Sequence, residues 1–165
     1  MNISRLYYLS IFIICASLLG FGYYLQFVDG LEPCPLCIFQ RIAYIAIAIS
    51  ALAGLIHGPL GKWRYLYSGL IFVAAVTGGV IAGRQVWLQH LPPEAVPACG
   101  PGLDFMMEVF PLTETLRMVF TGSGECAEVD WTFLSFSIAE WSLLWFVLFT
   151  ISSLFHIFNK LQKFN

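Results

Sequence analysis

Charge is scarce in this chain. Only 11% of its 165 residues are Asp, Glu, Lys or Arg, against about 25% in an ordinary soluble domain. Hydrophobic residues make up 59% of the chain, and the mean hydropathy is +0.79. This composition excludes a soluble globular domain, and we expect no nucleic-acid partner. It predicts an integral membrane protein in contact with the lipid bilayer.

Four apolar stretches are long enough to cross about 30 Å of hydrocarbon as helices. They cover residues 6–28, 37–56, 65–87 and 141–158. The first and last contain no charge, while the middle two contain only Arg41 and Arg84. We therefore expect an all-α protein, a four-transmembrane-helix bundle forming a single membrane domain over 1–165. The segments 29–36 and 91–140 are its outer loops.

The first stretch lacks the features of a cleaved leader. Its apolar run exceeds the roughly 7–15 residues of a signal-peptide core, and no small-x-small cleavage site follows it. Cys15 is preceded by Ile13 and Ile14, where a lipoprotein processing site would have a small residue. We expect residues 6–28 to remain as a helix.

Outside the spans, all but one of the lysines and arginines lie in one set of connecting segments; the exception is Arg117, in the segment 91–140. The others precede the first helix, separate the second from the third and follow the fourth: Arg5, Lys62, Arg64, Lys160 and Lys163. The positive-inside rule makes that side, with both termini, cytoplasmic. All ten acidic residues lie in the two other loops, which supports the same orientation.

Cysteine is also scarce, but its placement is informative. Of five cysteines, four fall on the outer side, where disulfides persist. Cys34 and Cys37 form a Cys-x-x-Cys pair at the start of the second predicted helix, Cys99 and Cys126 lie in the second outer loop, and Cys15 is alone in the first helix. An even number of outer cysteines suits a disulfide-exchanging function.

The Cys-x-x-Cys pair has features of a reactive site. Both a helix N-terminus and a nearby guanidinium favour the thiolate, and Arg41 lies one turn beyond Cys37 on the same helical face. An arginine inside a hydrophobic span usually has a partner, so we favour contact with an anion or cofactor. The alternative is that Arg41 snorkels to the nearby interface.

The second pair is open to more than one interpretation. Cys99 and Cys126 are separated by 26 residues, and glycines lie close to both. The pair could be an exchanging disulfide, or a loop staple worth roughly 3–4 kcal/mol. We expect no metal site, because this pair lacks close spacing and the histidines His57, His90 and His156 are scattered.

Three further features bear on the site. His90 is placed at the outer end of the third helix, where an imidazole near Arg41 could supply hydrogen bonds and protons to a quinone; a plain interfacial histidine is the alternative. The small residues along 74–83 predict close helix packing, with room for a flat ligand as a secondary possibility. Residues 112–120 predict a short helix lying on the membrane, or else an irregular loop.

Together these residues resemble the DsbB family, the bacterial inner-membrane thiol oxidoreductases that reoxidise the periplasmic protein DsbA. The resemblance covers nearly the whole chain. It rests on the segment 32–41 (Glu-Pro-Cys-Pro-Leu-Cys-Ile-Phe-Gln-Arg), the histidine ending the third helix, and Gly-Ser-Gly-Glu-Cys-Ala-Glu at 122–128. Gln40 is a departure, since glutamate is typical of the family there.

The resemblance implies an electron route in which Cys34, Cys37, Cys99 and Cys126 are catalytic. A reduced periplasmic DsbA-type thioredoxin-fold protein attacks Cys99 of a Cys99–Cys126 disulfide. Cys126 then exchanges with Cys34 of the Cys34–Cys37 disulfide, and Cys37 passes electrons to membrane quinone (ubiquinone or menaquinone) beside Arg41 and His90. DsbA is a strong oxidant at about −120 mV, whereas ordinary dithiols lie near −180 to −270 mV, so a more oxidising acceptor is needed.

Two other interpretations remain open at this stage. A vitamin K epoxide reductase-like protein is also quinone-linked, but the loop cysteines of that family precede the Cys-x-x-Cys, whereas here they follow it. A non-enzymatic membrane module with structural disulfides is the other. The sequence does not distinguish ubiquinone from menaquinone, or a general DsbA partner from a dedicated one.

Overall fold

The protein is a four-helix membrane bundle. A computed structural model describes residues 3–58, 62–96, 111, 124–129 and 131–161. Its long helices within these ranges are α1 (Ile3–Phe27), α2 (Pro35–His57), α3 (Lys62–Gln89) and α6 (Ile138–Leu161). In the described ranges four helices are long and apolar enough to cross a membrane. The four predicted spans are confirmed, and the last begins a few residues earlier than expected.

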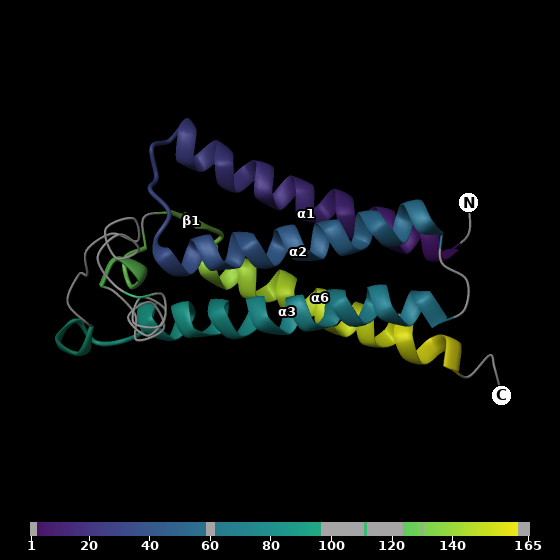
Figure 1. Cartoon of the computed structure of the whole chain (residues 1–165). Helices are drawn as coiled ribbons and strands as arrows, with labels where there is room; N and C mark the ends of the chain where they lie inside the picture. Colours follow the sequence, from purple (N-terminus) through teal and green to yellow (C-terminus); the bar gives the residue numbers. More distant parts are fainter. Residues whose placement is uncertain (1–2, 59–61, 97–110, 112–123, 130, 162–165) are drawn as a thin grey trace.

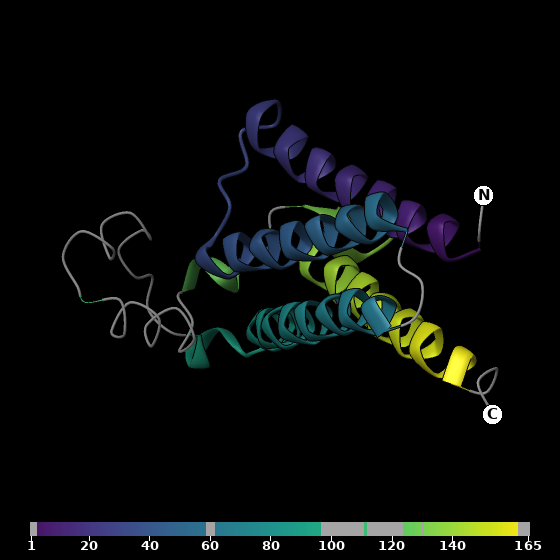
Figure 2. The same ribbon diagram turned by 45° about the vertical axis from the view of Figure 1, so that its right-hand side comes forward.

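The helices pack in sequence order, α1 on α2, α2 on α3 and α3 on α6. The start of α1, the end of α2 and the end of α6 lie at one end of the bundle (Figure 1). The start of α2 and the short hairpin that precedes α6 lie at the opposite end. In both views α1 diverges from the other helices towards that second end (Figure 2). This divergence positions the site described below.

The contact between α3 and α6 depends on small residues. Ala75 and Ala82 are fully buried, and a Cβ atom added at Gly78 would collide with the ring of Phe146 on α6. The predicted close packing is therefore confirmed. Phe146 fills the space beside Gly78, so a flat ligand has no room at that point of the stripe.

The ends of α2 follow from its sequence. Cys34 is the N-cap residue in an extended conformation (φ −64°, ψ 161°) and Pro35 opens the helix, a position that suits a residue without an N–H. The helix ends at His57, and the C-cap residue that follows is Gly58, whose left-handed φ of 54° favours glycine. The first outer loop therefore delivers both Cys34 and Cys37 to the first turn of α2.

A short hairpin, which we did not expect, precedes α6. Strands β1 (Thr132–Phe133) and β2 (Phe136–Ser137) pair antiparallel. The turn residues Leu134 and Ser135 have positive φ values of 53° and 68°, where Asn-Gly would be the usual signal. Short 3₁₀ turns, η1 (Pro93–Ala95) and η2 (Gly124–Cys126), occupy other parts of this loop. The predicted helix at 112–120 lies outside the described residues.

The early start of α6 has a local cause. The backbone N–H of Ser137 donates to Glu140 Oε2 at 2.7 Å, and the N–H of Glu140 donates to Ser137 Oγ at 3.2 Å. This reciprocal pattern is a capping box. The Ser-x-x-Glu spacing was visible in the sequence and would have placed the helix start correctly.

Candidate active site

Three of the four cysteines expected to be catalytic lie together. The sulfurs of Cys34 and Cys37 are 2.9 Å apart at the start of α2. Cys126, in η2, is fully buried in an apolar cluster with Leu36 of α2 and Leu88 of α3, against which Cys34 packs. The fourth, Cys99, lies outside the described residues. The structure thus joins the Cys-x-x-Cys to one cysteine of the second outer loop.

Cys34 is held as a thiol between the other two sulfurs. A hydrogen bond with Cys126, then one with Cys37, and then burial raise the pKa of Cys34 above its ordinary value. The Cys37 sulfur therefore accepts a hydrogen bond from Cys34.

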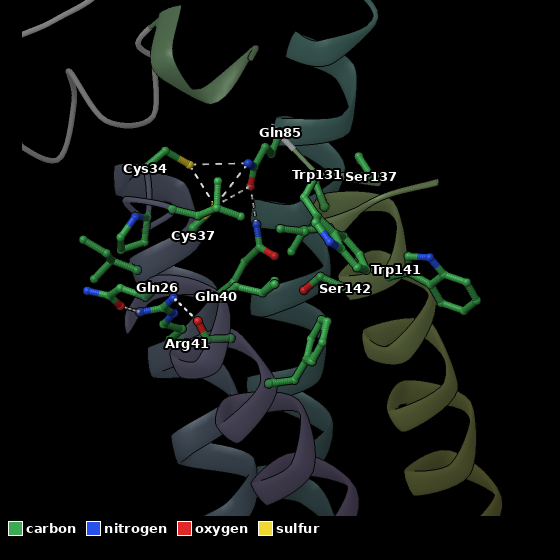
Figure 3. A pocket seen from close by; sticks show the side chains of 18 of the residues that line it. Gln26, Cys34, Cys37, Gln40, Arg41, Gln85, Trp131, Ser137, Trp141 and Ser142 are labelled. Carbon is green, nitrogen blue, oxygen red and sulfur yellow. Dashed lines mark hydrogen bonds between the residues drawn. The ribbon is translucent and has the colours of Figure 1, made fainter. Parts of the chain in front are cut away.

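A further hydrogen-bond donor to these sulfurs is a residue that we did not predict from the sequence. Gln85 of α3 is 4% exposed, and its Nε2 lies 3.4 Å from the Cys34 sulfur and 3.3 Å from the Cys37 sulfur (Figure 3). Its Oε1 accepts a 2.7 Å hydrogen bond from Nε2 of Gln40. One feature of the sequence could have identified Gln85. It is a polar residue inside an apolar span, and such residues are commonly functional or packed in the interior of the bundle.

A cavity of about 1280 Å³ opens beside the cysteines. Its walls come from α1, α2, α3, α6 and the outer-loop segments before α6, and Cys37, Gln40, Arg41 and Gln85 all line it (Figure 3). Aromatic side chains contribute to it, among them Trp131 and Trp145. A largely apolar cavity with a few convergent polar groups is the usual form of a small-molecule site.

Arg41 is turned towards α1. Its guanidinium donates to the Gln26 side chain and, at 3.1 Å, to the carbonyl oxygen of Gly22, and it lies 5.0 Å from the ring centroid of Tyr23. Arg41 and Cys37 share one cavity, but the guanidinium bonds to α1 and not to the sulfur. The guanidinium of Arg41 therefore has hydrogen-bond partners on α1, within the bundle, and does not need to snorkel to the interface to satisfy its charge.

His90 directly follows α3, at the outer end of that helix, and is exposed. Its side chain is 67% exposed, its Nδ1 bonds to the carbonyl of Val86 at 2.8 Å, and its Nε2 lies 3.8 Å from Glu140 Oε1. Among the described residues, it does not line the cavity that contains Arg41. Its role at a quinone stays a prediction.

Comparison with known proteins identifies the family. A family model described as disulfide bond formation protein DsbB matches residues 4–156. The disulfide bond formation protein B of Azoarcus sp. is 48% identical over 153 residues, which cover 93% of this chain and 92% of that protein. Disulfide bond formation protein B of Aromatoleum aromaticum is 47% identical over 157 residues, which cover 95% of this chain and 94% of that protein. Disulfide bond formation protein B 1 of Pseudomonas aeruginosa is 48% identical over 143 residues, which cover 87% of this chain and 88% of that protein.

These matches span the helices, the Cys-x-x-Cys pair and the loop cysteines together. They decide against the vitamin K epoxide reductase-like and the non-enzymatic alternatives. The chain belongs to the DsbB family of inner-membrane oxidoreductases, which form protein disulfide bonds by reoxidising DsbA.

Proposed function

We propose that this chain takes electrons from a DsbA-type thioredoxin-fold partner at Cys99–Cys126 and passes them through Cys34–Cys37 to a membrane quinone. The observation that carries the proposal is the contact of Cys126 with Cys34 beside Cys37. A residue of the second outer loop has no structural need to meet the start of α2 through its sulfur. A relay between two disulfides does need such a contact.

The contacts suggest which sulfur is attacked. The Cys126 thiolate, released when the partner attacks Cys99, attacks the Cys34 sulfur of the Cys34–Cys37 disulfide. A Cys126–Cys34 bond forms as the Cys34–Cys37 bond breaks, and Cys37 leaves as a thiolate with the electron pair. Cys37 suits the leaving role because its sulfur lies within hydrogen-bonding distance of the Gln85 amide.

The volume, lining and hydrogen-bond donors of the cavity suit a quinone. Its volume of about 1280 Å³ exceeds the roughly 300–1,000 Å³ of common ligand pockets, and its walls combine aromatic and aliphatic side chains. Arg41 has five N–H donors, of which the contacts with Gln26 and Gly22 use two. Cys37 and Arg41 would hold the ring, and the quinone, when bound, supplies a two-electron, two-proton acceptor.

We also propose the orientation. Arg5 and Arg64 lie near the end of the bundle at which α1 starts, since Arg5 contacts Gly58 and Arg64 accepts a hydrogen bond through its carbonyl from Tyr8. By the positive-inside rule this end is cytoplasmic, and the cysteine end is periplasmic. A membrane-impermeant maleimide should label reduced Cys37 from the periplasmic side only; labelling from the cytoplasm would contradict the orientation.

A test of the exchange step uses paired variants. In Cys37→Ser/Cys99→Ser, mild oxidation should join Cys34 to Cys126, as read by peptide mass spectrometry. The matched control, Cys34→Ser/Cys99→Ser, keeps Cys37 and Cys126 and should cross-link far less. Equal yields in the two variants, or no Cys34–Cys126 bond, would refute the proposed order of exchange.

A further inference from the structure

Gln85 is the polar group that spans both sulfurs of the Cys-x-x-Cys pair. Its amide nitrogen has two hydrogens and lies 3.4 Å from Cys34 and 3.3 Å from Cys37. Gln85 belongs to α3 and the cysteines to the start of α2. A neutral donor held at this place can stabilise a thiolate without adding a charge to an apolar environment.

The direction of the Gln85 amide determines whether it can act in this way. Its oxygen and nitrogen are on opposite sides of one planar group, and a rotated amide would present the oxygen to the sulfurs. In the observed orientation Oε1 lies 3.6 Å from the Cys37 sulfur, farther than Nε2 at 3.3 Å. Exchanging the two atoms would bring Oε1 to the nearer position, where Cys37 could donate to it only while it remains a thiol. The amide direction therefore selects between thiol and thiolate.

Gln40 sets this direction. Its Nε2 donates to Gln85 Oε1 at 2.7 Å, the shortest contact that Gln85 makes among those described. Gln40 is itself only 5% exposed and lies one turn along α2 from Cys37. A buried donor at this position engages the amide oxygen and leaves the amide nitrogen facing the cysteines (Figure 3).

We propose that Gln85 is a catalytic residue, which donates a hydrogen bond to the Cys37 sulfur as that sulfur leaves, and that Gln40 is its positioning residue. The inference rests on the proposed function, because it takes Cys34–Cys37 as the pair reduced by Cys126. The step is the one given above: Cys126 bonds to Cys34, and the electron pair of the broken Cys34–Cys37 bond stays on Cys37. Gln85 accepts no electron and loses no proton.

The test follows the cysteines themselves, without quinone. In the full-length protein with Cys99 and Cys126 changed to serine, Gln85→Leu should slow alkylation of reduced Cys37 at pH 7 by about tenfold, as expected for loss of a hydrogen bond to a charged group. The rate should recover towards the unsubstituted value as the pH rises. In a thiol–disulfide buffer, the ratio of reduced to oxidised pair should also fall by about tenfold, equal to about 30 mV.

Gln40→Leu should lower both the alkylation rate of Cys37 and the ratio of reduced to oxidised pair, but by less than Gln85→Leu does. In the Gln85→Leu background, Gln40→Leu should have no further effect, because a positioning residue acts only through its partner. Tyr8→Phe is the matched control, since it removes a buried interhelical hydrogen bond to Ser68 far from the cysteines; it should change neither readout.

Three outcomes would overturn the inference. They are an unchanged ratio in Gln85→Leu, a defect that persists at high pH, and additive effects in the double variant, which would mean that the two glutamines only pack α2 against α3. Failure of the proposed function is a separate result. It would appear as a Cys34–Cys37 pair that a reduced partner cannot reduce in the otherwise unsubstituted protein.

Discussion

Replacing Arg41 should weaken the use of quinone while leaving disulfide exchange intact. The guanidinium lines the cavity, and two of its donors bond to α1. The donors that remain can reach a ring oxygen or stabilise negative charge there. Arg41→Ala therefore removes a charged hydrogen bond from the cavity without touching the contact between Cys34 and Cys126.

The size of the effect follows from one such bond. A hydrogen bond to a charged group is worth about 1.5–3 kcal/mol, and each 1.4 kcal/mol is about a factor of ten. The apparent KM for quinone should rise by about 10- to 100-fold in Arg41→Ala. Arg41→Lys should recover part of the loss, because an ammonium keeps the charge but not the planar fork that engages both Gln26 and Gly22.

Steady-state kinetics against quinone concentration would measure this change, and partner oxidation in a single turnover would measure exchange. Gln26→Leu is the matched control: it releases one contact of the guanidinium with α1 but keeps the charge, so its KM should rise less than that of Arg41→Ala. An unchanged KM in Arg41→Ala, or a defect confined to exchange with the partner, would refute the assignment.

Three further predictions concern other parts of the chain. Cys15→Ala should retain normal abundance and quinol formation, because Cys15 is buried in the helical core and not among the outer cysteines; a large loss of activity would contradict this. Gly78→Val should lower thermal stability or abundance by a clash worth about 1–3 kcal/mol, whereas Gly69→Val, which meets no atom within 4 Å, should be tolerated; equal effects would contradict the packing. Cys126→Ser should let Cys99 trap the partner as a mixed disulfide, and Cys99→Ser should abolish the trap; trapping through Cys126 would reverse the order.

The sequence was sufficient for the features that depend on one segment at a time. Hydrocarbon thickness requires long uncharged helices, so hydropathy alone located the four spans. Pro35 after an extended Cys34 placed the Cys-x-x-Cys pair at a helix start. The small residues of α3 predicted a close contact, which Gly78 makes with Phe146.

Features that depend on the rotation of one helix against another were not predictable. Gln85 meets Cys37 only because α3 presents that side chain to the start of α2, and nothing in either segment encodes the relative register. The direction of Arg41 depends in the same way on where Gly22 and Gln26 fall on α1. The hairpin before α6 was missed because its Leu134–Ser135 turn lacks the usual turn residues.

The central claim is that electrons from a partner dithiol reach quinone through Cys37. The most direct measurement mixes a reduced DsbA-type protein with the purified chain and quinone, and follows partner disulfide and quinol in the same sample. We predict that both appear in equal amounts and that Cys37→Ser forms no quinol. Partner oxidation without quinol, or quinol formation that survives Cys37→Ser, would contradict the account.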